Sequence, residues 1–515
     1  MNYLLRSPAR AALFCLFSWS LVASGTVYHV DSESGNDTQS GTTPEQAWKS
    51  LQPVNQKLFQ PGDQILLKAG TRYTGQLKPL GSGALREGKI VPIVISSFGS
   101  GARPRIDTEG KFLDAVLLRN LEFWEVRNLE ITNLGEQRQP WQTGVRIVSD
   151  GFGKMRHIHL SNLFVHDVNG DLRKQEEGCG IYFESRGGNG SHFDDLRIEN
   201  CHVLRTDRNG ICQRGSGRTR SVGVVIRGNR LEDIGGDGIK PWGCDGCLVE
   251  YNRLYKARQR CSDYAAGIWP WSCDNTVIQF NEVSGVKGTR DGQAFDSDGN
   301  CRHTVFQYNY SHDNDGGFML LCTSGDWVMP QSVGNVDTII RYNISQNDGA
   351  RTFHITGPAK DAKIYNNIFF VGRGLDIPLF LYTDYRGWAD GTYVANNVFY
   401  SEGKARYSYG TGRNWDGTYK DAPGFGQSTN NVFENNIYYG THQNPPKDAK
   451  AITADPMLVG PGSGKVGFDS LEGYKFKDGS PCIAAGVPIK DNGGRDFWGN
   501  GVPEGKNPDV GAHQR

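Results

Sequence analysis

One short pattern recurs along most of the chain: two residues that are mostly apolar, two variable residues and an asparagine. The intervals between repeats, 23 to 39 residues, are too irregular for propeller blades, and the apolar positions are too rich in β-branched residues for a helical repeat. One such unit cannot bury its own apolar face, so the units must stack on one another. The pattern predicts an all-β protein, a parallel β-solenoid. The repeats end at Asn229, Asn252, Asn281, Asn309, Asn343, Asn367, Asn397 and Asn436.

Each of these asparagines is expected to stand at a bend, where a tolerance of left-handed backbone and side-chain hydrogen bonding both help. Stacked asparagines can then form a hydrogen-bonded ladder along the solenoid axis. The alternative is that they only form turns. Their fixed offset from the paired apolar residues favours the ladder.

The chain begins with a segment typical of secretion. Arg6 and Arg10 precede the apolar run AALFCLFSWSLVA, which is short for a bilayer span and ends in small residues. Residues 1–25 are therefore predicted to be a cleaved signal peptide, with a retained amino-terminal anchor as the alternative. The mature protein is predicted to be secreted or periplasmic, to contact no membrane and to be a monomer.

Composition narrows the class of partner. The 56 basic and 56 acidic side chains balance, which gives no electrostatic case for a nucleic-acid partner or an acidic membrane surface. Of eleven cysteines, Cys15 lies in the predicted signal peptide, and the ten others permit disulfides in an exported protein. Cys244, Cys273 and Cys301 each lie eight residues before a recurring asparagine and should stack in one column, where three cannot all pair with each other.

Residues 26–75 do not follow the repeating asparagine pattern. An expected strand is followed by a polar loop and by a helical pattern near Ala47 to Leu58. A solenoid needs a cap over its first coil, and a short amphipathic helix would supply it. We expect coils over residues 76–440 and a carboxy-terminal extension over residues 441–515 that packs on them.

Both ends of the chain carry more specific motifs. The opening VDSESGNDTQSGTTPEQAWKSL, and the ending with Asp455-Pro456, SPCIAAG from Ser480, NGGRDFWGN from Asn492 and PDVGA from Pro508, resemble those of secreted proteins of the pectate-lyase-like superfamily. The resemblance implies a right-handed single-stranded parallel β-helix. This superfamily includes polysaccharide lyases, glycoside hydrolases and epimerases, so the reaction must be argued from a surface.

One row of strands offers such a surface. Seven strands can be aligned on a small residue that precedes each, from Gly180 to Ala350, and their first and third positions are mostly apolar. Because strand side chains alternate between faces, the second and fourth positions should point outward. The second positions include Lys240 and Trp269. The fourth positions are Glu184, Arg214, Trp242, Trp271, Asp296, Leu321 and His354.

Tryptophans on an outer face suggest a sugar-binding surface. Trp242, Trp269 and Trp271 offer rigid apolar platforms for a pyranose, and Arg214 and Glu184 can bond its substituents. The alternative is that a loop, either Arg258 to Tyr264 or Leu172 to Gly178, covers the rings. The expected partner is a polysaccharide or an oligosaccharide.

Two reactions compete on this surface. A glycoside hydrolase needs two carboxyl groups, about 5 Å apart for retention or about 6.5 to 9.5 Å apart for inversion. Asp296 is the leading candidate, with Asp298 or Asp291 as its partner, and no cofactor. Some β-helix xylosidases place an aspartate in a similar strand and a glutamate one coil later, but residues 318–322 contain no acid.

A polysaccharide lyase would instead remove a proton α to a uronate carboxylate, often with a cation such as Ca²⁺. Lys240, with Arg214 beside it, or His354 could act as the base. A third possibility is a non-catalytic glycan-binding solenoid. The acids among the tryptophans favour the hydrolase.

Overall fold

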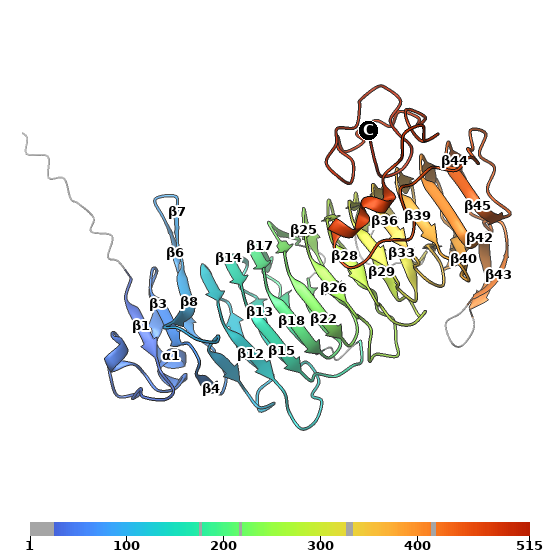
Figure 1. Cartoon of the computed structure of the whole chain (residues 1–515). Helices are drawn as coiled ribbons and strands as arrows, with labels where there is room; N and C mark the ends of the chain where they lie inside the picture. Colours follow the sequence, from blue (N-terminus) through green and yellow to red (C-terminus); the bar gives the residue numbers. More distant parts are fainter. Residues whose placement is uncertain (1–24, 175–177, 216–218, 326–332, 414–418) are drawn as a thin grey trace, which may run out of the picture.

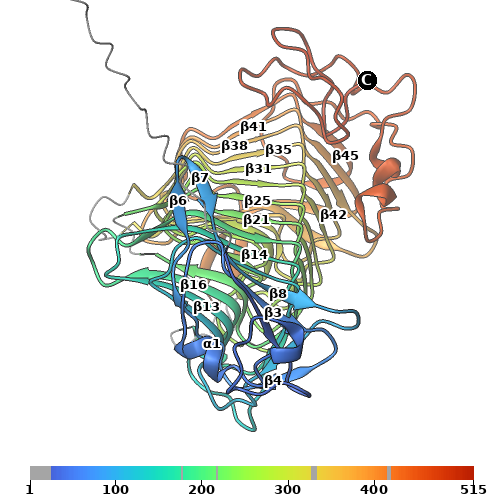
Figure 2. The same cartoon turned by 90° about the vertical axis from the view of Figure 1, so that its left-hand side faces the viewer.

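The computed structural model describes residues 25–174, 178–215, 219–325, 333–413 and 419–515, so nearly all of the predicted signal peptide lies outside the described part. The chain winds into an elongated stack of coils (Figure 1). Seen along the stack, the coils enclose one continuous interior (Figure 2). Three rows of parallel strands run along the axis and are called sheets 1, 2 and 3 below.

Sheet 1 contains the strands that precede the recurring asparagines. Its order is β1 (Val27–Val30), β3 (Gln64–Lys68), β8 (Ile93–Phe98), β11 (Trp124–Arg127), β14 (Lys154–Ser161), β17 (His192–Glu199), β21 (Val225–Arg227), β25 (Leu248–Glu250), β27 (Val277–Gln279), β31 (Val305–Gln307), β35 (Ile339–Arg341), β38 (Lys363–Tyr365), β41 (Tyr393–Ala395) and β44 (Val432–Glu434). The short strands β20 (Ser221–Val222), β24 (Cys244–Asp245), β30 (Cys301–Arg302) and β34 (Asn335–Val336) lie just before its later members.

Sheet 2 follows the asparagines. It contains β4 (Arg72–Thr74), β9 (Arg105–Asp107), β12 (Glu130–Asn133), β15 (Phe164–Val168), β18 (His202–Thr206), β22 (Arg230–Ile234), β26 (Arg253–Tyr255), β28 (Glu282–Ser284), β32 (Tyr310–His312), β36 (Ile344–Gln346), β39 (Ile368–Val371), β42 (Val398–Arg413) and β45 (Ile437–Gln443).

Sheet 3 closes each coil. It contains β10 (Asp114–Arg119), β13 (Thr143–Asp150), β16 (Cys179–Arg186), β19 (Asn209–Arg214), β23 (Ile239–Lys240), β29 (Gln293–Ser297), β33 (Gly317–Cys322), β37 (Phe353–Thr356) and β40 (Asp376–Thr383). Between β23 and β29 the sheet is held by single bridges at Ile268 and Trp271. Pro241 and Pro270 lie in this stretch, and proline lacks the N–H group that a ladder needs.

The predicted asparagine ladder is confirmed. Each asparagine from Asn229 to Asn397 is buried and donates from Nδ2 to Oδ1 of the next, over 2.9 to 3.1 Å. Asn436 ends the ladder on Asp448, over 3.0 Å. The pairing of β25, β27 and β31 is parallel throughout, as a β-helix requires.

The backbone at these bends differs from the prediction. The residue before each asparagine, rather than the asparagine itself, takes the left-handed conformation. Several of these residues are aromatic: Tyr251, Phe280 and Tyr308 have φ near 55° and stack with ring centroids about 5 Å apart. Ring stacking along the axis helps to offset the strain of a bulky residue in this region.

The amino-terminal cap is less helical than predicted. The helix α1 spans only Gln52–Gln56, after the 3-10 turn η1 (Pro44–Gln46). Pro53 lies in the first turn of α1, a position that suits proline, and Trp48 pairs with Val30 in an extended conformation. The small strands β2 (Leu58–Phe59), β5 (Leu80–Gly81), β6 (Ala84–Arg86) and β7 (Lys89–Val91) complete this end.

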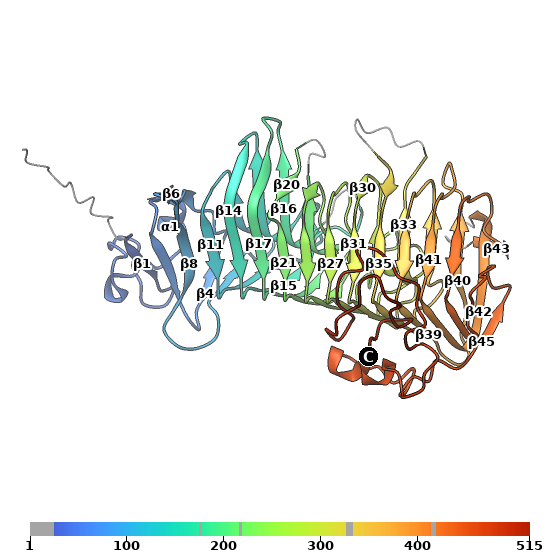
Figure 3. The same ribbon diagram turned by 90° about the horizontal axis from the view of Figure 1, so that it is seen from above.

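The carboxy-terminal residues pack along the outside of sheet 2 (Figure 3). They include the 3-10 segment η2 (Phe468–Tyr474), while β43 (Tyr419–Pro423) forms an antiparallel pair with β42. Tyr474 is buried there and donates a hydrogen bond of 2.7 Å to Gln346. Among the described residues, none of the helices is long and apolar enough to cross a membrane.

The ten described cysteines are free thiols. Cys244, Cys273 and Cys301 do stack in one column, as predicted, and all three are fully buried in the core. Burial raises the pKa of each thiol well above its usual range, so these cysteines behave as small apolar side chains.

Candidate active site

Sheet 3 carries the selected residues in two outward rows. Its register aligns Lys240 with Trp269 and Asp296 in the first row, and Trp242 with Trp271 and Asp298 in the second. Later in the sheet, Asp296 pairs with Leu320, and Leu320 with His354. The first row runs Tyr182, Cys212, Lys240, Trp269, Asp296, Leu320 and His354. The second row runs Glu184, Arg214, Trp242, Trp271, Asp298, Cys322 and Thr356.

This register corrects the predicted alignment. Asp296 was expected beside Trp271 but lies beside Trp269, because Ile268 pairs with Phe295 rather than with Gln293. The two glycines used for alignment have different roles: Gly267 lies against the carbonyl of Ala294 within the sheet, whereas Gly292 has φ of 75° and forms a turn.

The shift of two residues keeps Asp296 on the outer face and moves Asp298 opposite Trp271. His354 moves to the first row, two coils beyond Asp296. The next strand is offset from the predicted alignment by only one residue, which reverses its two faces, so Leu320 points outward and Leu321 into the core.

The three tryptophans differ in exposure. Trp242 and Trp271 are half-buried, with ring centroids 5.8 Å apart. Trp269 is 3% exposed, and its Nε1–H donates to Oδ1 of Asp237 over 2.9 Å. Trp269 is therefore held in place beneath the surface and cannot stack on a sugar ring. Its predicted role in substrate binding is corrected.

Loops supply further groups that the sequence did not single out. The Lys174 ammonium, from the segment Leu172 to Gly178, lies 5.4 Å from the Trp269 ring centroid, so the covering loop foreseen as an alternative exists for this ring. The half-buried Trp141 precedes β13, and the exposed Arg214 guanidinium lies 5.8 Å from the rings of both Trp141 and Trp242. Lys174 and Trp141 lie outside the aligned strands, so the strand pattern in the sequence could not identify them.

Three carboxyl groups lie within electrostatic reach of one another, and Asp298 stands in register with the half-buried Trp271. Asp291 and Asp298 are partly exposed, whereas Asp296 is 3% exposed and its Oδ1 has no hydrogen-bond partner. Burial raises the pKa of Asp296 well above its usual range, and repulsion from Asp298 and Asp291 adds to the shift. Its surroundings therefore favour the protonated form of Asp296.

Asp298 has a different environment. Its Oδ1 accepts the Gly299 N–H over 2.6 Å, and the Cys322 thiol also bonds to the carboxyl group. Burial raises the pKa of Asp298 to about 6, while the Lys174 ammonium and the Gly299 N–H oppose the rise. Asp298 thus ionises more readily than Asp296 on the same strand.

Lys240 belongs to a buried charge cluster beneath these acids. It is 2% exposed, and its ammonium lies 3.8 Å from Oδ2 of Asp237 and 5.3 Å from the Trp269 ring centroid. Burial alone would raise the pKa of Asp237, but the charges of Arg208, Lys240 and Lys174 lower it. Asp237 therefore stays ionised and holds Trp269 and Lys240 in place.

The remaining predicted residues lie apart from the acids. His354 is buried, with Nε2 2.8 Å from the Thr383 hydroxyl. Glu184 lies at the other end of the second row, where the Arg186 guanidinium is 3.3 Å away. The structure thus brings Asp298 next to Trp271 and Trp242, with Arg214 at the rim, and places Asp291 and Asp296 within electrostatic reach of Asp298.

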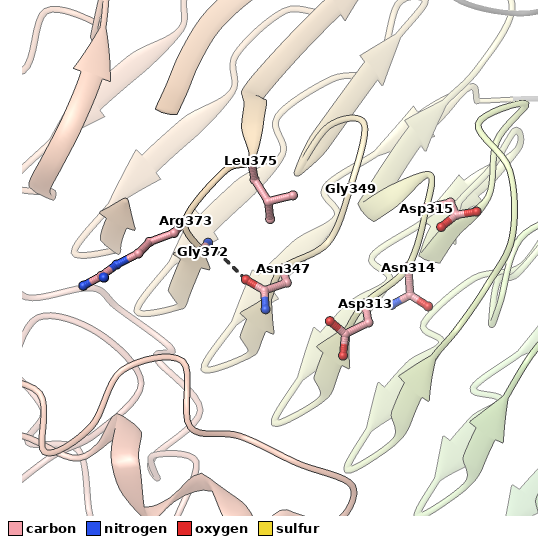
Figure 4. Close-up of a pocket in the computed structure, with 8 residues that line it drawn as sticks. All are labelled: Asp313, Asn314, Asp315, Asn347, Gly349, Gly372, Arg373 and Leu375. Atoms are coloured by element: carbon pink, nitrogen blue, oxygen red, sulfur yellow. Dashed lines mark hydrogen bonds between the residues drawn. The ribbon is translucent and has the colours of Figure 1, made fainter. Parts of the chain in front are cut away.

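A cavity of about 460 Å³ lies beside the amino-terminal ends of β33, β37 and β40 (Figure 4). Its walls come from successive turns, with Asp313 to Asp315 on one and Asn347 on the next, where Gly372 donates to Oδ1 of Asn347 over 3.0 Å. Asp298 and Trp271 lie at the other end of the sheet 3 strands, so this cavity is separate from them.

Comparison with known proteins agrees with the fold. Residues 179–399 match the family model described as "Right handed beta helix region". The right-handed parallel β-helix implied by the sequence is thereby confirmed.

Two curated proteins resemble the chain. Lacto-N-biosidase of Bifidobacterium longum subsp. longum is 28% identical over 611 aligned residues, which cover 95% of this chain and 36% of that protein. The chain thus spans about a third of this relative's length. Alpha-1,3-galactosidase A of Akkermansia muciniphila is 34% identical over 73 residues, which cover 14% of this chain and 11% of that protein.

Among solved structures, the native GH136 lacto-N-biosidase from Eubacterium ramulus superposes with a TM-score of 0.61 at 29% identity. The match covers 74% of this chain and 68% of that one. Its selenomethionine derivative gives a TM-score of 0.60 at 27% identity and covers 80% of this chain and 67% of that one.

Proposed function

We propose that this right-handed β-helix protein is a glycoside hydrolase that cleaves an oligosaccharide with two aspartates on the outer face of sheet 3. The observation that carries the proposal is the placement of Asp298 beside the half-buried Trp271, with Asp296 and Asp291 within electrostatic reach. Similarity to lacto-N-biosidase supports the same class of reaction. The reaction requires no cofactor, since both proton transfer and attack are carried out by carboxyl groups.

Exposure indicates which acids touch the substrate. Asp291 and Asp298 are partly exposed, whereas Asp296 lies under them against Trp269. We assign Asp298 as the ionised partner, which attacks the anomeric carbon or activates water, because two donors stabilise its charge. Asp291 is assigned as the proton donor. It lies just before strand β29, and its carboxyl group is partly exposed, whereas that of Asp296 is buried.

Asp296, which the sequence favoured, then acts as a positioning residue. It is buried on the same strand as Asp298, and the repulsion between the two carboxyl groups raises the pKa of Asp296, so its protonated form would leave the charge on Asp298. Donation by Asp296 itself is the rival assignment, and the variants below distinguish the two.

The aromatic surface supplies binding. Trp242 and Trp271 stand one coil apart, so each can stack on a sugar ring, and Arg214 at the rim can bond its hydroxyl groups. Lacto-N-biose units are the first ligands to test, since the similar enzymes are named for them.

The lyase alternative is weaker on this geometry. A base that removes the proton α to a uronate carboxylate must reach its substrate, but Lys240 is sealed beneath Trp269 and beside Asp237. Wild type and the Lys240→Met variant should therefore both form only saturated cleavage products. Formation of an unsaturated product from a uronate polysaccharide, lost in Lys240→Met, would replace the hydrolase by a lyase.

The decisive experiment measures hydrolysis of a panel of oligosaccharides, including lacto-N-biose-containing ones, by wild type, Asp291→Asn, Asp296→Asn and Asp298→Asn. Asp291→Asn and Asp298→Asn should each lower kcat by about 10²- to 10⁴-fold, the range for a group that transfers a proton. Asp296→Asn should retain much more activity. Equal losses in Asp296→Asn and Asp298→Asn with an active Asp291→Asn would make Asp296 the donor, and activity in all three variants would refute the site.

A further inference from the structure

Strands β11, β14 and β17 are neighbours in sheet 1 (Figure 3). A second cluster of polar side chains lies on their outer face. Glu125, His157 and His159 each offer one oxygen or nitrogen atom, and these atoms all lie within 4.8 Å of one another. Asp195 stands beside them on the next coil. None of these residues belongs to the site on sheet 3.

A bend shared by two strands builds this cluster. Arg156 pairs with Asp194 and Ile158 with Leu196, so His157 and Asp195 lie at the same register between these pairs, both with a left-handed φ, of 50° and 66°. The bend interrupts strand alternation, so Met155 and Ile158 both pack in the core, while His159 lies outward beside His157. Their ring centroids are 3.8 Å apart. Strained backbone of this kind persists where surrounding structure fixes it, and it often marks a functional site.

One carboxylate orients both imidazoles. Oδ2 of Asp195 lies 2.8 Å from Nδ1 of His157 and 3.0 Å from Nε2 of His159. An imidazole that donates one N–H to a carboxylate presents its other nitrogen as a lone pair, the arrangement common among metal-bound histidines.

The second ring nitrogen of His157, Nε2, is available to bind an ion. His157 is 6% exposed, and its Nε2 is buried with no hydrogen-bond partner, 3.5 Å from Oε1 of Glu125. A buried polar nitrogen normally finds a partner. A cation between this nitrogen and the Glu125 carboxylate would satisfy both.

We propose that Glu125, His157 and His159 form a binding site for a divalent transition-metal ion of the zinc type, with Asp195 as the residue that orients both histidines. Two imidazoles and one carboxylate suit Zn²⁺ better than Ca²⁺ or Mg²⁺, which prefer oxygen ligands.

The surroundings allow access and balance the charge. The side chains of Glu125 and His159 are 27% and 22% exposed, so an ion can enter from solvent and keep a water ligand. Arg127 lies 3.5 Å from Glu125, and Arg197 lies 2.9 Å from Oδ1 of Asp195. These arginines neutralise the outer oxygens and leave the inner ones for the ion and the imidazoles.

The expected role is structural. The four residues come from three successive coils, so a bound ion would tie these coils together near the amino-terminal end of the stack. The ion would raise thermal stability without taking part in glycan cleavage.

The test uses the full mature chain, freed of metal by a chelator and titrated with Zn²⁺ by calorimetry. Wild type should bind one ion per chain, with a rise in Tm, and Co²⁺ in its place should show the visible absorption of a nitrogen- and oxygen-ligated site. Asp195→Asn should weaken Zn²⁺ binding by about 10- to 100-fold, as for other residues that orient metal ligands. His157→Ala and His159→Ala should abolish the Tm response.

His303→Ala is the matched control, because His303 is an exposed histidine near a carboxylate, 3.3 Å from Asp337. It should bind Zn²⁺ as wild type does. Circular dichroism of each variant verifies its fold, and Asp195→Asn keeps the test valid if a histidine variant misfolds. Absence of Zn²⁺ binding in wild type, or unchanged binding in Asp195→Asn and His157→Ala, would overturn the proposal and leave a proton-linked ion-pair cluster.

Discussion

The asparagine ladder allows one prediction to be worked out from individual hydrogen bonds. Asn309 stands in mid-ladder and is fully buried. Its Nδ2 donates to the Ile278 carbonyl over 2.9 Å and to Oδ1 of Asn343 over 3.0 Å. Its Oδ1 accepts from the backbone N–H of Asn281 over 2.9 Å and from Nδ2 of Asn281 over 3.1 Å. The substitution Asn309→Ala removes all four hydrogen bonds.

The loss of stability depends on which partners of Asn309 are left without another hydrogen bond. Asn343 still accepts the backbone N–H of Asn309, and Nδ2 of Asn281 still donates to Val249 and Gln279. The Ile278 carbonyl and the Asn281 N–H lose these bonds without a replacement from the ladder. Each buried group left unsatisfied costs about 1 to 3 kcal/mol, so Asn309→Ala should lower the free energy of unfolding by about 2 to 6 kcal/mol.

The assay is guanidinium denaturation followed by circular dichroism, with Asn507→Ala as control. Asn507 is exposed, and its backbone is outside the left-handed region, so alanine fits there without strain. The control should change stability by less than about 0.5 kcal/mol, as is usual at the surface. If Asn309→Ala and Asn507→Ala shift the midpoint equally, the ladder results from turn formation and does not stabilise the stack.

Two further predictions concern the site on sheet 3. Replacing Trp242 or Trp271 with Ala should weaken oligosaccharide binding by about 1 to 3 kcal/mol, measured by calorimetry on an inactive Asp298→Asn background, with little change in Tm; a large loss of Tm at unchanged affinity would make the rings part of the core. Because the pKa of Asp298 is about 6, the rate of hydrolysis should fall as pH drops through about 6, where the proposed ionised partner gains a proton. The raised pKa of Asp298 also makes the free energy of unfolding depend on pH. Because the folded pKa exceeds the value of about 3.9 for an unfolded aspartate, the stability that Asp298 contributes is present below pH 4 and is lost as pH rises through about 6. Asp298→Asn should remove this pH dependence, and its persistence would assign the titration to another group.

The sequence by itself determined the architecture. The apolar pairs before each asparagine define one strand per coil, and their constant offset places Asn229 through Asn436 in one column, because the geometry of a stacked coil is local and repeats. Strand alternation also identified the outer face of sheet 3, since parity survives a shift of two residues, as Asp296 shows.

The tertiary structure decided which of those outward residues meet. The register after Gly292 depends on the conformation of the preceding turn, which the glycine alone did not reveal. Burial of Trp269 depends on Lys174, almost a hundred residues away in sequence, and on Asp237 beneath it. The cluster on sheet 1 depends on a bend, shared by two adjacent strands, at which His157 and Asp195 both take a left-handed conformation. Each of these features arises from contacts between coils, whereas the repeat reports only the fold within a coil.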